Sequence, residues 1–323
     1  MPGNAIVFVH GRGLKPPPDV LQDEWWSALR TRVPPELHEA MSASVQLAYY
    51  ADVLYDSANV AGGTATDAQT TILGTAMEHA LRLWLPGASA APPTGAAGGR
   101  PVSDDAITFI EDAVKYFAWN YSGKVAKPLI DILDGLAGQQ TNILIISHSL
   151  GTMVTYDVLC DHPYHIDSWV TLGSPLGWTQ DVWARLPQGL IGLIPNLPVL
   201  SSALDTTILA ALQPRVANPA APLRPPTTRR EYPVPTLSFP QSATVDRWLN
   251  IYDPGDPVAA LDPSVGDDFP AADGSSRGID VALRNPGRRP GDPGSAHSDP
   301  GYLSTWPVGQ TVTDFWIRNP PGG

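Results

Sequence analysis

A short stretch from Thr141 to Gly151 constrains the fold more than any other part of the chain. It begins with an unbroken aliphatic run from Ile143 to Ile146 and then passes at once into small and polar residues around Ser149. A continuous run of branched aliphatic side chains is typical of a parallel strand that is covered on both faces. The small residues Ser147 and Gly151 would relieve crowding where such a strand reverses into a helix. The stretch therefore predicts a buried parallel strand followed by a sharp strand-to-helix turn.

Ser149 would project from this turn at the N-terminus of the following helix. There the helix dipole and the free N–H groups favour the negative charge that develops during acyl transfer. The sequence Ser147-His148-Ser149-Leu150-Gly151 is close to the G-x-S-x-G pattern of a nucleophile elbow, with serine in place of the first glycine. We take Ser149 as the candidate nucleophile. The alternative is a serine that only caps an ordinary strand-to-helix turn.

A second apolar strand is predicted from Ala5 to Val9, and His10-Gly11-Arg12-Gly13 follows it directly. Glycines let the backbone turn tightly and present N–H groups to a ligand. We expect the backbone N–H of Arg12, together with that of Leu150, to face the oxyanion of a tetrahedral intermediate. His10 is a weaker candidate for a base, because a histidine at a strand end beside glycine more often holds its loop by hydrogen bonds.

Two aspartates, Asp253 and Asp256, follow a strand predicted from Val245 to Tyr252. An acid after the serine and before the histidine is the chain order expected for a nucleophile elbow. We favour Asp256, because it lies past the strand end, where it can turn toward a histidine. Asp253 remains the alternative, although its position is more typical of a residue that caps the turn.

The last predicted strand runs from Ile279 to Arg284, and His297 follows it in a loop of glycine, proline and serine. A helical segment from Thr305 to Ile317 comes next. A histidine after the final strand and behind an acid loop suits a catalytic base. The other downstream or helical histidines are less suitably placed: His38, His79, His162 and His165.

With these elements in this order, the chain resembles the α/β-hydrolase superfamily, and within it the lipase- and esterase-like serine hydrolases. The segments that carry the resemblance are Val9–Gly13, Ser147–Gly151, Gly173–Gly177, Asp256–Val258 and His297. The resemblance implies an α/β fold, a compact and mainly parallel sheet of about six strands with helices on both faces. It also implies a triad of Ser149, His297 and Asp256, with no metal and no organic cofactor. The chain departs from the family at Ser147 and in having its oxyanion strand almost at residue 1, which predicts that the leading antiparallel strands of larger members are missing.

The composition is consistent with one domain over residues 1–323, because a chain that is 43% hydrophobic can bury a large core. Two insertions are predicted within it. Residues 86–101, rich in alanine, glycine and proline, are expected to form a flexible surface loop. A cap or lid is expected over residues 174–244. Its apolar segment from Leu190 to Leu200 either packs on the core or contacts an acyl chain.

Charge and hydropathy exclude some classes of partner. The 20 basic and 32 acidic residues give a net charge of −12 without a Lys/Arg cluster, which argues against nucleic acid. No apolar run reaches the roughly 20 residues that span a bilayer, while an apolar lid is compatible with transient contact with a lipid surface. Residues 5–9 are assigned to a strand and not to a secretory signal, so we expect a cytoplasmic location. No metal-ligand spacing or nucleotide-binding motif is apparent.

These observations predict a hydrolase of carboxylic esters, acting on a small-molecule or lipid ester. An acyltransferase would use the same residues but deliver the acyl group to another acceptor. A non-catalytic binding protein on the same fold is the alternative from a different class, because fold does not fix function. The oligomeric state is left open.

Overall fold

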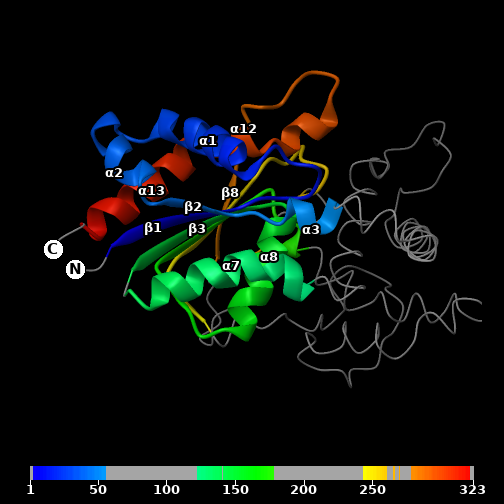
Figure 1. The fold of residues 1–323 in the computed structure, drawn as a ribbon. Helices are drawn as coiled ribbons and strands as arrows, with labels where there is room; N and C mark the ends of the chain where they lie inside the picture. The colour runs from blue at the N-terminus through cyan, green and yellow to red at the C-terminus, as the bar shows by residue number, and fades with distance from the viewer. Residues whose placement is uncertain are drawn as a thin grey trace, which may run out of the picture.

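The computed structural model describes residues 3–55, 122–139, 141–177, 243–259, 265, 269 and 278–320. Within these ranges six strands form one sheet in the order β2-β1-β3-β5-β7-β8, and every neighbouring pair is parallel (Figure 1). The prediction of a mainly parallel sheet of about six strands is therefore confirmed. The six strands are β1 (Asn4–Val9), β2 (Val45–Ala48), β3 (Asn142–His148), β5 (Ser168–Leu172), β7 (Trp248–Tyr252) and β8 (Gly278–Ala282).

Helices lie on both faces of the sheet (Figure 1). One face carries α1 (Pro18–Leu29), α12 (Asp299–Leu303) and α13 (Trp306–Arg318), and the other carries α7 (Ser122–Ala137) and α8 (Leu150–Asp161). The remaining described elements are short: η1 (Arg30–Arg32), η2 (Pro35–Leu37), α2 (His38–Ser42), α3 (Ala51–Tyr55), β4 (His165–Ile166), β6 (Thr244–Val245) and η5 (Pro293–His297).

The apolar runs form strands because both of their faces are buried. Side chains alternate between the two faces of a strand. In β1, Ile6 and Phe8 pack in the core with the Trp25 side chain of α1, whereas Val7 packs in the opposite core with Leu129 of α7. All residues of β1 are buried. An unbroken hydrophobic run is thus the pattern that this position in the sheet requires.

The sheet places several loops at one edge, because the carboxyl ends of parallel strands point the same way. His10 directly follows β1, Ser149 directly follows β3 and Gly173 directly follows β5. Gly151 lets α8 begin directly beside the end of β1, since a Cβ atom there would collide with the carbonyl oxygens of Val9 and His10. This close approach brings the N-terminus of α8 next to the loop that follows β1.

Some predicted boundaries are wrong. The single strand predicted from Val245 to Tyr252 is two strands, β6 and β7, because Asp246 bonds to Ile166 through its N–H while Trp169 bonds to the carbonyl of Arg247. The sheet partner therefore changes within this segment. β8 ends at Ala282, two residues before the predicted end, and His297 closes a 3-10 helix instead of lying in an open loop.

The edge strand β2 was not predicted. Most of the predicted cap over 174–244 and all of the predicted loop over 86–101 lie outside the described residues. The division into one domain with two insertions therefore stays a prediction. Among the helices of the described ranges, none has the length and apolar character needed to cross a membrane.

Candidate active site

Ser149 occupies a strained turn between β3 and α8. Its φ is 54° and its ψ is −127°, and it is the only non-glycine residue of the described ranges with a positive φ. Such a conformation costs about 1–3 kcal/mol and persists only where the surroundings enforce it. The Ser149 N–H donates to the carbonyl of Leu172 at 3.0 Å, and the Ser149 carbonyl accepts from the N–H and hydroxyl of Thr152 at 2.9 and 2.7 Å. These bonds fix the turn from both sides.

Ser147, which stands where the elbow pattern has glycine, is accommodated by the neighbouring strand. Its buried hydroxyl accepts a hydrogen bond from the indole N–H of Trp169 at 2.8 Å and donates to the carbonyl of Val170 at 3.4 Å. Both partners belong to β5. The extra side-chain atoms therefore face β5, and their polar group is satisfied there.

The structure brings Ser149, His297 and Asp256 together. The Ser149 hydroxyl lies 2.7 Å from Nε2 of His297, and Nδ1 of His297 lies 2.8 Å from Oδ2 of Asp256. Because a carboxylate only accepts, Nδ1 carries the hydrogen, which leaves Nε2 to accept from the serine hydroxyl. The distance from Ser149 to His297 falls in the range of roughly 2.6–3.2 Å expected of a nucleophile and its base. The catalytic role of the three residues remains a prediction.

Asp256 is held by four hydrogen-bond donors. Oδ1 accepts from the N–H groups of Val258 and Ala259 at 2.8 and 3.3 Å. Oδ2, which faces His297, also accepts from the hydroxyl of Tyr302 at 2.7 Å. Asp256 is completely buried. Its orientation is therefore fixed by the backbone on one side and by Tyr302 on the other.

Tyr302 is a site residue that the sequence analysis missed. Its hydroxyl accepts from the N–H of Asp253 at 2.8 Å while it donates to Asp256. Burial, followed by the negative charge of Asp256, raises the pKa of Tyr302, so its hydroxyl stays protonated and remains a donor. A tyrosine outside any motif carries no local signal of this role.

Asp253, the alternative acid, lies beside the site without facing the imidazole. Its Oδ1 accepts from the Gly255 N–H at 2.7 Å and from Arg288 at 3.3 Å, and its Oδ2 accepts from the Asn285 N–H at 2.8 Å. These bonds tie the loop after β7 to the segment after β8. The contacts fit the turn-capping interpretation of Asp253 and place Asp256 against His297.

The backbone of His297 is held by its neighbours. The amide of Asn285 donates to the carbonyls of Ala296 and Ser298 at 3.0 and 2.9 Å, on either side of His297. The His148 Nε2–H donates to the His297 carbonyl at 3.0 Å, and the two rings lie 4.5 Å apart. Burial, and then the charge of His297, hold the pKa of His148 well below its usual value. His148 is therefore a neutral support for the imidazole.

Gly173 leaves room for this pair at the end of β5. Its φ is +52°, and a Cβ atom there would lie 2.7 Å from Oδ2 of Asp256 and 3.0 Å from Nδ1 of His297. A side chain at this position would therefore strain the backbone and displace the imidazole or the carboxylate.

The predicted oxyanion loop lies against the elbow. A Cβ atom on Gly11 would be 2.7 Å from the Cβ of Ser149. Leu150 is the first residue of α8, where an N–H has no acceptor within the helix. These contacts place the loop beside Ser149. The binding of an oxyanion by the Arg12 and Leu150 N–H groups stays a prediction.

His10 holds the loop that follows β1. Its Nδ1–H donates to the carbonyl of Gly11 at 2.7 Å, and its Nε2 accepts from the N–H of Tyr50 at 3.0 Å. The Tyr50 ring stacks on the imidazole at 4.0 Å. Burial lowers the pKa of His10 to about 3, so the ring is neutral near pH 7. With both nitrogens engaged, His10 is a structural residue and not a base.

No protein-family model, curated protein or solved structure matches this chain. Any assignment of function therefore depends on the residues and their geometry.

Proposed function

We propose that this protein is a serine hydrolase that cleaves carboxylic esters through an acyl-enzyme. The observation that carries the proposal is the unbroken hydrogen-bond chain from the Ser149 hydroxyl through the imidazole of His297 to Asp256, at 2.7 and 2.8 Å. A serine beside an imidazole that is itself oriented by a carboxylate is the arrangement that activates a hydroxyl for attack on an acyl carbon. The strained turn adds support, because a serine that only caps a helix does not require a positive φ.

The reaction would proceed in two halves. Ser149 Oγ attacks the ester carbonyl carbon while Nε2 of His297 takes the serine proton, and the N–H groups of Arg12 and Leu150 bind the resulting oxyanion. The carbon–alcohol bond then breaks, the alcohol takes the proton from His297, and the acyl group remains on Ser149. Water then attacks the acyl carbon while Nε2 of His297 takes a proton from the water. The bond to Ser149 Oγ breaks, Ser149 takes that proton from His297, and the acid is released. Asp256 keeps the imidazole in the required tautomer and stabilises its charged form.

Membership of the α/β-hydrolase superfamily belongs to the same proposal. It is supported by a parallel sheet in which the candidate nucleophile follows β3, a strand with neighbours on both sides, and the acid and histidine follow β7 and β8. A cap over residues 174–244 and a substrate with an apolar acyl group are favoured by the apolar sequence from Leu190 to Leu200.

Labelling with a fluorophosphonate, read out by intact mass, tests the proposal without knowledge of the substrate. The wild-type chain should gain one adduct and hydrolyse p-nitrophenyl esters, and Ser149→Ala should do neither. Ser147→Gly is the matched control, because it changes a serine of the same turn and should still be labelled. Labelling of Ser149→Ala to the wild-type extent, or a folded wild-type chain that neither labels nor turns over any ester, would overturn the proposal.

A further inference from the structure

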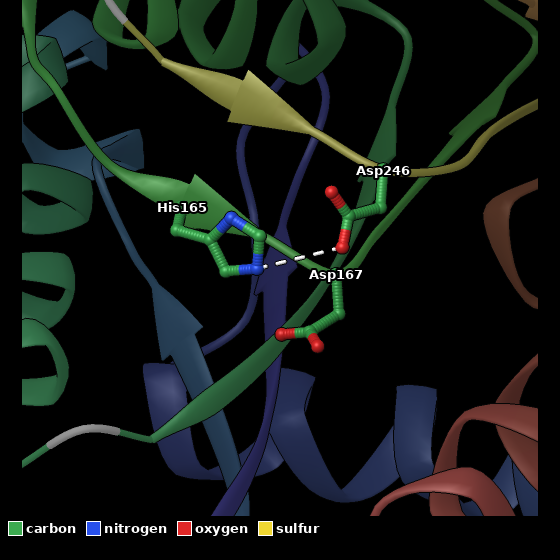
Figure 2. A group of neighbouring side chains, drawn as sticks. All are labelled: His165, Asp167 and Asp246. Atoms are coloured by element: carbon green, nitrogen blue, oxygen red, sulfur yellow. Dashed lines mark ion pairs between the residues drawn. The ribbon is translucent and has the colours of Figure 1, made fainter.

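A second group of side chains, which could hold a metal ion, lies near the amino ends of the strands, opposite the carboxyl ends where Ser149 lies. His165 belongs to β4, Asp167 directly precedes β5, and Asp246 directly follows β6. Figure 2 shows His165 and Asp246 facing each other across their ion pair, with Asp167 beside them and its carboxylate directed away from Asp246. One ligand atom from each lies within 4.8 Å of the others, and Nε2 of His165 lies 3.4 Å from Oδ2 of Asp246.

Strand pairing, and not the chance rotation of loops, gathers these residues. β4 and β6 pair in parallel, with His165 opposite Thr244 and Ile166 opposite Val245. Asp167 and Asp246 directly follow the paired residues Ile166 and Val245, so the pairing of β4 with β6 brings these two aspartates close to each other and to His165. The paired residues Ile166 and Val245 are buried. Strand pairing therefore fixes the Cα positions of the three residues relative to one another.

Asp167 is oriented by a strand outside the group. Its Oδ2 accepts from the N–H of Ile143 at 2.8 Å, and its own N–H donates to the Ile143 carbonyl at 3.0 Å. A carboxylate with one oxygen held by a backbone N–H presents its other oxygen in a defined direction. Metal-ligating side chains are commonly oriented by outer partners of this kind.

We propose that His165, Asp167 and Asp246 bind a divalent transition-metal ion, with zinc as the first candidate. One imidazole nitrogen and two carboxylate oxygens form a ligand set that zinc accepts, with a water molecule at the fourth position. Ligand atoms at about 2.0–2.2 Å from a tetrahedral zinc ion lie about 3.4 Å apart. Nε2 of His165 and Oδ2 of Asp246 have this separation, 3.4 Å. Asp167, whose ligand atom lies within 4.8 Å of the other two, would be the third ligand.

The charge of the group favours a divalent ion over the existing ion pair alone. Asp167 and Asp246 carry two negative charges when ionised, and His165 supplies at most one positive charge. A divalent ion neutralises both carboxylates. Magnesium prefers a shell of oxygen atoms, so the imidazole selects for zinc and similar ions.

The ion would act on the framework and not on the ester chemistry. The five residues of β5 separate this group from Gly173 at the edge where Asp256 and His297 lie. Asp167 and Gly173 are six residue steps apart, which at about 3.3 Å per step is about 20 Å. A bound ion would instead join the segment before β5 to the segment before β7. This inference is independent of the proposed hydrolase function.

Zinc titration of chelator-treated full-length protein tests the site. Calorimetry should show about one ion per chain, and zinc should raise the Tm. His165→Asn and Asp246→Asn should each weaken binding at least tenfold and remove the rise in Tm. His162→Asn removes a nearby histidine outside the group and should bind zinc as the wild type does. Magnesium at the same concentration should not raise the Tm.

Three results would overturn the proposal: no zinc binding below millimolar concentration, unchanged binding in the His165 and Asp246 variants, or an equal loss in His162→Asn. The two test side chains are 61% and 47% exposed, so their replacement should leave the fold intact, as circular dichroism checks. If Asp246→Asn is unstable, His165→Asn alone decides the outcome. Fluorophosphonate labelling by the zinc-free protein reports separately on the hydrolase proposal.

Discussion

Replacing Asp256 with asparagine should reverse the tautomer of His297. Because the N–H groups of Val258 and Ala259 donate to Oδ1, the asparagine oxygen has to remain there, and its NH₂ group turns toward the imidazole. Nδ1 of His297 then accepts a hydrogen bond, and the ring hydrogen moves to Nε2. Nε2 can no longer take the proton of Ser149.

The expected loss of kcat distinguishes Asp256 from Asp253 as the acid that orients His297. Tautomer reversal in a Ser-His-Asp triad costs about 10⁴ in kcat, or about 5.4 kcal/mol of activation free energy. In Asp253→Asn, the two carboxylate oxygens that accept from the Gly255 and Asn285 N–H groups become one oxygen and one donor. One buried N–H loses its acceptor, which costs about 1–3 kcal/mol of folding free energy. Asp256→Asn should therefore lose activity, and Asp253→Asn should lose mainly stability.

The assay is kcat/KM on p-nitrophenyl acetate and butyrate, with urea unfolding of each variant. We expect a loss of about 10⁴ for Asp256→Asn and of less than about tenfold for Asp253→Asn. If folded Asp253→Asn loses more activity than Asp256→Asn, the acid of the triad is Asp253. If neither loses activity, the imidazole does not depend on an acid and the tautomer argument fails.

Further predictions concern the residues around the three candidate catalytic side chains. Ser147→Gly should keep ester turnover but lower the unfolding free energy in urea by about 1–3 kcal/mol, because the Trp169 indole N–H loses its acceptor; unchanged stability would contradict this. Tyr302→Phe removes a donor from Asp256 and should lower the unfolding free energy by about 1.5–3 kcal/mol, with a smaller loss of kcat than Asp256→Asn; equal losses of kcat would show that the hydroxyl, and not the carboxylate, is decisive. Burial holds the pKa of His10 at about 3, against about 6.5 in the unfolded chain, so the unfolded state binds more protons between these values. The unfolding free energy should therefore fall as the pH drops from 6.5 toward 3, and His10→Gln should have a shallower slope in urea titrations across that range; identical slopes would refute the assignment.

The central strands could be predicted because their signal is local. The apolar runs that became β1 and β3 are buried on both faces, so each sequence position reports directly on its environment. β2 gives a weaker signal, because it is a four-residue edge strand whose middle residues, Gln46 and Leu47, are only partly buried. Whether a short segment forms an edge strand depends on its hydrogen bonds to the neighbouring strand. That pairing cannot be read from the sequence.

Some residues of the candidate site could likewise be predicted from the sequence, and others could not. Ser149, Asp256 and His297 could be selected because each follows a recognisable strand and their chain order matches a known arrangement. Tyr302 and Asn285 could not, since their bonds depend on which loops meet after folding. The His165, Asp167 and Asp246 group was missed for a related reason. The His-x-Asp alternation is visible in the sequence, but Asp246 joins it only through the pairing of β4 with β6.

The short helix η5 determines how easily the candidate base can leave its position by local unfolding. His297 is the last residue of this five-residue 3-10 helix, which is tied down by the capping side chain of Asp292 and the amide of Asn285. A segment of this size buries little apolar surface of its own, so it can open locally at a lower free energy than the sheet. On warming, turnover would therefore cease while the strands still protect their amide hydrogens from exchange with solvent. If the proposed hydrolase function holds, the temperature range of activity would be set by this peripheral segment and not by the hydrophobic core.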